Sequence, residues 1–85
     1  MEHLELYQAE SCPFCEKVRQ FCTDNGIDVL LRNPRRAGGE VTNQEQYDEL
    51  LEHGMDQIPL LVDNKRGEAL YESDDIVEHL DEHYC

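Results

Sequence analysis

Two cysteines three positions apart, Cys12 and Cys15, carry the clearest chemistry in this sequence. They stand in the run Cys-Pro-Phe-Cys, which follows a short alternation of apolar and polar residues and opens a helical pattern. Unpaired backbone N–H groups and the positive end of the helix dipole favour a thiolate at a helix start, so Cys12 is the expected nucleophile. Cys15 lies on the same side of the first turn, where its thiol can attack a disulfide formed at Cys12. The motif therefore predicts thiol–disulfide redox chemistry.

The residues around this motif predict a strand, a helix and a second strand. Residues 3–8 alternate apolar with polar side chains, which is typical of a strand. The following helix should end at Gly26, and its apolar stripe for core burial consists of Phe14, Val18, Phe21 and Cys22. Residues 27–32 predict the second strand. A strand, a helix and a strand of these lengths form a βαβ unit, so we expect the two strands to be parallel.

The middle of the chain predicts a second helix and a central strand. Thr42, followed three residues later by Glu45, has the form of a capping box, and the helix that it opens should run to Gly54. Residues 58–62 are nearly all apolar. Such a run predicts a strand that is covered on both faces.

The end of the chain predicts a hairpin and a last helix. Residues 63–67 have turn chemistry, and residues 69–71 should form the returning strand. Ser73 is expected to cap the last helix, with Asp74 and Asp75 in its first turn, where the dipole favours negative charge. The whole order is βαβαββα, which predicts one α/β domain with a four-stranded mixed sheet flanked by helices over the full 85 residues.

Composition limits the partners and the compartment. The chain has 20 acidic and 7 basic residues, a formal net charge of -13. So negative a protein is not expected to bind nucleic acid or an anionic membrane, and such acidity predicts a halophilic source. We find no signal peptide at the start of the sequence and no apolar run long enough to cross a membrane. These features, together with only four cysteines, predict a cytoplasmic protein rather than a disulfide-stapled secreted one.

Read as a whole, the sequence resembles the glutaredoxins, a family with the thioredoxin fold. The resemblance covers nearly the whole chain and rests on three stretches: Cys12-Pro13-Phe14-Cys15, Ile58-Pro59, and Tyr71-Glu72-Ser73-Asp74-Asp75. The last stretch is also similar to the N-terminal thioredoxin-like domain of glutathione transferases. Both families use the same kind of thiol site, so the resemblance implies the thioredoxin/glutaredoxin fold.

The resemblance also implies how a γ-glutamyl thiol would bind. Pro59 should be a cis-proline that faces the cysteine pair, and the backbone of Ile58 should pair with the cysteine of the thiol. Glu72, Ser73 and Asp74 would hold the γ-glutamyl end, since helix N–H groups bind a carboxylate and an acidic side chain meets an ammonium. From the residues alone, two plainer readings stay open. Pro59 could be a trans-proline at a strand start, and Ser73 could simply cap the helix.

One departure from the family pattern bears on the identity of the thiol. Many glutaredoxins carry a lysine three residues before the first cysteine, where this chain has Ala9 followed by Glu10. We therefore expect a less stabilised thiolate and one contact fewer to the glycine carboxylate of glutathione. The cations that could compensate, or could merely pair with nearby carboxylates, are Arg32, Arg35 and Arg36. Glutathione and γ-glutamylcysteine both remain candidates.

The resemblance implies a thiol–disulfide oxidoreductase that reduces protein or mixed disulfides with a γ-glutamyl thiol. Its partners would be that low-molecular-weight thiol and disulfide-containing client proteins, and we expect a monomer that needs no metal. Two alternatives stay open. One is a transferase-like thiol-binding module with little turnover, and the other is an iron–sulfur cluster carrier that uses Cys12 from two chains.

The remaining reactive side chains have simpler explanations. Cys22 is expected to be a core thiol, although it could also act as a secondary thiol, and Cys85 should be exposed. His79 and His83, four residues apart on the last helix, could chelate a metal but more simply lie on a solvated helix face. Tyr7 is expected to be an ordinary strand residue.

Overall fold

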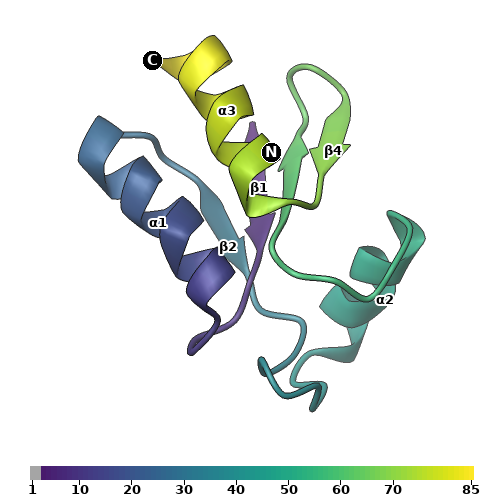
Figure 1. Cartoon of the computed structure of the whole chain (residues 1–85). Coiled ribbons are helices and arrows are strands. Elements are labelled where there is room, and N and C mark those ends of the chain that lie inside the picture. The colour runs from purple at the N-terminus through teal and green to yellow at the C-terminus, as the bar shows by residue number, and fades with distance from the viewer. Residues whose placement is uncertain (1–2) are drawn as a thin grey trace.

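Residues 3–85, which the computed structural model describes, form a four-stranded sheet and three helices in the predicted order (Figure 1). In chain order the elements are β1 (Leu4–Tyr7), α1 (Pro13–Asn25), β2 (Leu30–Arg32), α2 (Gln44–Glu52), β3 (Leu60–Asp63), β4 (Glu68–Leu70) and α3 (Ser73–Tyr84). This arrangement confirms the predicted thioredoxin-like fold. None of the helices in this part of the chain has both the length and the apolar composition that crossing a bilayer requires.

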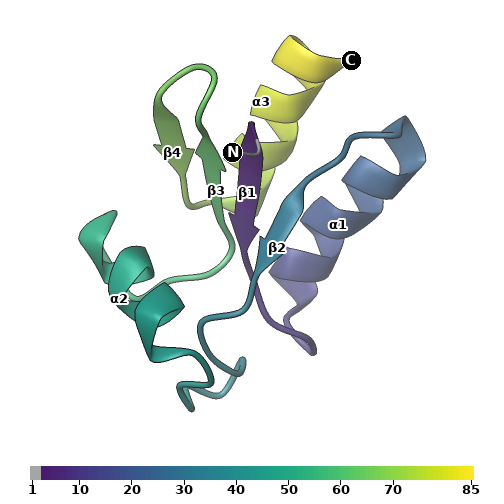
Figure 2. The same ribbon diagram turned by 180° about the vertical axis from the view of Figure 1, so that it is seen from behind.

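The sheet has the strand order β2-β1-β3-β4. Strands β1 and β2 are parallel, as the βαβ unit predicts, whereas β1 with β3 and β3 with β4 are antiparallel. Helices α1 and α3 cover one face of the sheet and α2 covers the other, as the two opposite views show (Figures 1 and 2). The sheet is therefore mixed and flanked by helices on both sides.

Each face of the sheet has its own core, because neighbouring residues of a strand point to opposite faces. Leu4, Leu6 and Leu61 pack against α1 and α3, whereas Leu60 and Val62 pack against α2. All four residues of β3 are buried, which confirms that this strand is covered on both faces.

Two predictions about apolar residues were wrong, namely the burial of Phe14 and the length of the second strand. Phe14 is 63 % exposed, because the buried side of α1 runs through Cys15, Val18 and Cys22 instead, at positions i, i+3 and i+7. The second strand is shorter than residues 27–32 and lies at the edge of the sheet, so Leu30 and its neighbour remain partly exposed.

The starts of α2 and α3 differ from the predictions by one residue, and α2 ends at Glu52, two residues before the predicted end at Gly54. Asn43, not Thr42, is the N-cap of α2, because its side-chain oxygen accepts the N–H of Gln46 at 3.0 Å, while the Thr42 hydroxyl donates to a loop carbonyl. Glu72, not Ser73, occupies the N-cap position of α3, and Ser73 is already helical. At the end of α1, Gly26 is the left-handed C-cap (φ 64°) that the sequence predicts.

The most consequential difference concerns Asp63, which the sequence places in a turn. It is the last residue of β3 and is fully buried. Its carboxylate contacts His79 Nε2 at 2.8 Å and the Tyr84 hydroxyl at 2.9 Å, and it accepts the backbone N–H groups of Lys65 and Arg66. The prediction of a solvated His79 was therefore wrong, because this side chain is only 7 % exposed.

These contacts set the charge state of Asp63. Burial by itself raises the pKa of a carboxyl group, but the hydrogen bonds from His79, Tyr84 and the Arg66 N–H outweigh it here. The pKa of Asp63 is therefore lowered from its ordinary value of 3.8. A buried carboxylate thus ties the turn after β3 to the second half of α3.

We expect Asp63→Asn to lower the free energy of unfolding at pH 7 by about 2–4 kcal/mol, because His79 and Tyr84 lose the buried carboxylate that they contact. Because the pKa of Asp63 is lowered in the folded state, its carboxylate contributes to the free energy of unfolding at neutral pH. This contribution is lost as the pH falls through the folded-state pKa. Urea denaturation at pH 7 and at pH 3 measures both effects. Asp81→Asn, an exposed carboxylate of the same helix, is the control. Equal losses in the two variants would contradict this account.

Candidate active site

Cys12 is the N-cap residue of α1. It has extended backbone angles (φ -109°, ψ 108°), and Pro13 is the first helical residue. Its sulfur accepts the backbone N–H of Cys15 at 3.4 Å, as an N-cap side chain does. Ser11, just before it, has a left-handed conformation (φ 63°) that turns the chain into the helix. The thiol therefore sits against the donors of a helix N-terminus, where negative charge is favoured.

The second thiol of the pair has a very different environment. Cys15 is fully buried, and burial is the main reason that its pKa is raised to about 12, with the hydrogen bond to Cys12 adding to the effect. Cys15 is therefore a neutral thiol at physiological pH. Cys12 is also buried, at 8 % exposed, so the two cysteines of this helical turn differ in how deeply they lie.

A groove of about 340 Å³ lies beside the first turn of α1. The structure brings together five of the residues that the sequence analysis assigns to thiol binding, namely Ile58, Pro59, Glu72, Ser73 and Asp74, and adds Phe14, Gln57 and Tyr71. The peptide bond between Ile58 and Pro59 is cis, as the family resemblance implies and against the plainer reading. Neither Cys12 nor Cys15 lines the groove itself; Phe14, between them in sequence, does.

The polar end of the groove is the start of α3. The N-cap residue Glu72 makes no side-chain capping bond, so the first N–H groups of the helix are not used by that side chain. Ser73 is 9 % exposed, and Asp74 forms an ion pair with Lys17 of α1. This end can hold a carboxylate at the N–H groups, and Asp74 can hold an ammonium in place of Lys17 Nζ.

Two residues of this region make contacts that the sequence analysis did not predict, although Tyr71 belongs to one of the stretches that carry the resemblance. Gln57 donates a hydrogen bond to the Glu72 carboxylate at 3.3 Å, which links the segment before the cis-proline to α3. Tyr71 orders the same segment, because its hydroxyl accepts the N–H of Met55 at 3.0 Å. Lys17 reaches Asp74 over 57 residues of sequence, so only the fold could reveal the pair.

The arginines considered as partners of a glycine carboxylate do not line the groove. Arg32 pairs with Glu5 at 2.8 Å, and Arg35 pairs with Asp56 at 2.6 Å. Arg36 pairs with a carboxylate four residues further along the chain. Each guanidinium thus has a carboxylate partner of its own.

The loop before the cysteines has its own cation, which the sequence analysis did not anticipate. Ala9 is buried, and its carbonyl lies 3.5 Å from the Arg19 guanidinium, which also bonds the side chain of Gln8. The same guanidinium lies 3.6 Å from the Glu10 carboxylate. Arg19 therefore ties this loop to the second turn of α1 and partly offsets the acidic residue beside Ala9.

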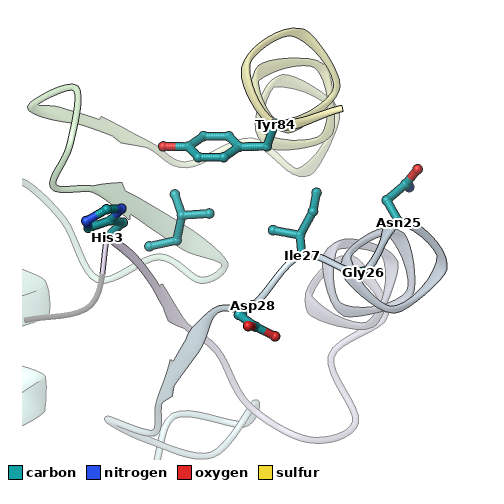
Figure 3. Close-up of a pocket in the computed structure, with 7 residues that line it drawn as sticks. His3, Asn25, Gly26, Ile27, Asp28 and Tyr84 are labelled. Carbon is teal, nitrogen blue, oxygen red and sulfur yellow. The ribbon is translucent and has the colours of Figure 1, made fainter.

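A second cavity, of about 420 Å³, lies at the far end of α1 (Figure 3). Its wall includes Gly26, Ile27 and Tyr84, and it contains no cysteine. The 13 residues of α1 span about 20 Å, so this cavity lies far from the thiols. Within residues 3–85 no three side chains of metal-binding type are grouped so that they could hold an ion. The groove beside Phe14 is therefore the candidate site.

Comparison with protein families shows the family of this chain. Residues 6–85 match the family described as the glutathione S-transferase N-terminal domain. The chain belongs to this family. No curated protein sequence gives a significant match.

Solved structures add the fold and a close relation to glutaredoxins. A diazinon-metabolizing glutathione S-transferase of the silkworm Bombyx mori is 28 % identical (TM-score 0.73; 95 % of this chain, 37 % of that one). Glutaredoxin 2 of Salmonella typhimurium, solved in complex with glutathione, is 26 % identical (TM-score 0.71; 95 % and 34 %). The NrdH-redoxin of Escherichia coli shares the fold at 18 % identity (TM-score 0.68; 91 % and 92 %).

These comparisons confirm the resemblance to glutaredoxins and to transferase N-terminal domains. The chain is a thioredoxin-fold module of the glutaredoxin and glutathione transferase type. It spans about a third of the length of the transferases that it matches, 34 % and 36 % for two of them.

The burial of the thiols predicts how they react with an alkylating agent. Because the pKa of Cys15 is about 12, only about one molecule in 10⁴ carries its thiolate at pH 8, against roughly a quarter for a free cysteine. We expect iodoacetamide to modify Cys15 about a thousandfold more slowly than the exposed Cys85 of the same chain. Peptide mass mapping over time, on reduced protein, measures both rates. Similar rates at the two positions would show that Cys15 is not sequestered.

Proposed function

We propose that this chain is a glutaredoxin-like thiol–disulfide oxidoreductase with Cys12 as the nucleophile and Cys15 as the resolving thiol. The observation that carries the proposal is the asymmetry of the pair. Cys12 lies at a helix N-terminus and is 8 % exposed, whereas Cys15 is fully buried and neutral. A nucleophile that meets the substrate first and a second thiol that stays protected until it is needed are what a two-step exchange requires.

The reaction proceeds in two exchanges. The Cys12 thiolate attacks one sulfur of a substrate disulfide, so that the S–S bond breaks, a mixed disulfide forms on Cys12, and the other sulfur leaves as a thiolate that takes up a proton. Cys15 then loses its proton and attacks the sulfur of Cys12, which closes the Cys12–Cys15 disulfide and releases the second substrate thiol. Two electrons pass to the substrate in total.

A low-molecular-weight γ-glutamyl thiol would restore the cysteine pair. One thiol molecule attacks the Cys12–Cys15 disulfide and remains on Cys12, and a second attacks that mixed disulfide and leaves as the oxidised dimer. The groove supports such a ligand, with Ser73 and the N–H groups of α3 for its carboxylate and Asp74 for its ammonium. The glutathione complex of the similar glutaredoxin 2 supports the same ligand class.

The groove offers fewer contacts to the glycine carboxylate of glutathione than to its γ-glutamyl end. No arginine or lysine lines the groove within residues 3–85, and each of the three arginines considered above has a carboxylate partner. Recognition would therefore rest on the γ-glutamyl and cysteine parts of the ligand. We infer that γ-glutamylcysteine binds about as well as glutathione.

The alternative is a thiol-binding module with little turnover of its own. The family match to a transferase N-terminal domain favours it. The two candidates differ in the reactivity of Cys12: only an oxidoreductase needs this thiol to exchange with a disulfide faster than a free thiol does.

A variant in which only Cys12 can react tests the proposal. The variant combines Cys15→Ser with Cys22→Ala and Cys85→Ser. We expect Cys12 in this variant to form adducts with oxidised glutathione and with oxidised γ-glutamylcysteine at least tenfold faster than free cysteine reacts with the same disulfides. Alanine is chosen at Cys22 because that side chain is buried in the core. Intact mass recorded over time in molar KCl measures the rates.

The control keeps Cys15 and carries Cys12→Ser with the same changes at Cys22 and Cys85. It should form almost no adduct, because Cys15 is buried and neutral. Adduct rates at Cys12 no better than those of free cysteine, in a variant that binds the thiol, would support the binding module instead of the oxidoreductase.

The γ-glutamyl end of the site is tested separately. We expect Asp74→Asn to raise the KM for a glutathione mixed disulfide about tenfold, because a charged hydrogen bond to the ammonium is lost. Asp75→Asn removes the same charge from the next residue, which does not line the groove, and should change KM less than twofold. Steady-state kinetics of the two variants decide the question, and equal effects would place the ammonium elsewhere.

A further inference from the structure

The face of the sheet that α2 covers contains a cavity of about 540 Å³ that plays no part in the thiol chemistry. Its floor is formed by the side of β1, β2 and β3 that faces α2, and its wall is the end of α2. Helix α2 stands on the opposite side of the sheet from α1, which carries the cysteines (Figure 2). A volume of this size lies in the range that small-molecule sites occupy.

Strand register explains why polar side chains gather on this floor. Tyr7 of β1 pairs with Arg32 of β2, and Glu5 pairs with Val62 of β3. Residues paired across strands point to the same face, and so do residues two apart along a strand, so all four side chains point toward α2. The helix adds Glu49 and Glu52, which are three residues apart and therefore share one side of it.

The Tyr7 hydroxyl is the polar group at this cavity that is free to bond a ligand. Tyr7 is only 3 % exposed, yet its hydroxyl has no hydrogen-bond partner among residues 3–85. In this part of the chain every fully enclosed side-chain nitrogen or oxygen does have a partner, so the Tyr7 hydroxyl is not enclosed but opens on the cavity that it lines. The ring of His53 stands edge-on to the Tyr7 ring, with 5.9 Å between the two ring centroids.

The charges around this hydroxyl are unbalanced. Arg32 is matched by Glu5 at 2.8 Å. Glu49 and Glu52 form no ion pair with any residue from 3 to 85, so the carboxylates of Glu5, Glu49 and Glu52 at this cavity outnumber the Arg32 guanidinium by two. The pKa of Tyr7 is raised, first by burial and then by Glu49, Glu5 and Glu52, while Arg32 acts in the opposite direction.

We propose that this cavity binds an aliphatic amine, with its ammonium groups between Glu49, Glu52 and the Tyr7 hydroxyl. Carboxylate and phenol oxygens accept hydrogen bonds from an ammonium, and a ligand with two ammonium groups balances the two carboxylates. The apolar side of Val62 on the floor suits the methylene chain of such a ligand. A metal ion fits less well, since no three side chains of metal-binding type are suitably grouped in the described residues.

The probe for the test is 1,4-diaminobutane, titrated into the full chain in 0.15 M KCl and followed by NMR. We expect saturable shifts confined to Tyr7, His53, Val62 and the end of α2. Butane-1,4-diol, which has the same length without the charges, should cause no saturable shift.

Matched variants locate the site. Glu49→Gln and Tyr7→Phe should each raise the dissociation constant of the diamine at least fivefold, while Glu45→Gln, the same change at an exposed position on α2, should alter it less than twofold. Tyr7→Phe keeps the volume of the buried ring, and a thermal melt verifies that each variant is folded.

Two results would overturn the proposal. The first is a set of shifts spread over the acidic surface and weakened equally by Glu49→Gln and Glu45→Gln, which would mean general binding to a protein of net charge -13. The second is the absence of saturable shifts at Tyr7 in the unmodified chain. The test is independent of the thiol chemistry, because neither cysteine of the motif lines this cavity.

Discussion

The burial of β3 on both faces is the constraint on which the rest of the structure depends. Alternate residues of this strand pack under α1 and α3 on one side and under α2 on the other, so the strand fixes both layers at once. The cis peptide at Pro59 directly precedes it, and Asp63 ends it. One end of the strand therefore shapes the groove, and the other end holds the second half of α3, whose first turn completes that groove.

The spacing of the two thiols is set by the local motif, whereas their burial is set by the fold. Their spacing places both in one helical turn, which the sequence alone specifies. The packing of α1 on the sheet buries Cys15 completely and leaves Cys12 8 % exposed, since the buried side of the helix passes through Cys15 and not through Phe14. Thiol exchange between the two residues needs their closeness, and under the proposed function the deeper burial of Cys15 makes Cys12 the first to react.

Much of the fold and part of the site could be predicted from the sequence. Apolar periodicity gave the order of the elements, and Gly26 gave the end of α1, because these signals are local. The errors concern contacts between distant segments. The sequence does not show that Asp63 lies against His79. Nor does it show that Glu5 of β1 lies beside Arg32, where the two form an ion pair. The Lys17–Asp74 pair at the groove was missed for the same reason.

The ion pairs have a consequence for the kinetics of encounter. Six of the 7 basic side chains lie within 4 Å of a carboxylate, so the positive charge is neutralised locally and the 13 excess negative charges set the long-range field of the chain. An anionic ligand approaches against that field, and its association rate constant is lowered by long-range repulsion. Added salt screens this repulsion beyond a Debye length of about 10 Å at 0.1 M. The protein is thus built so that anionic partners reach it faster as ionic strength rises, the reverse of electrostatic steering.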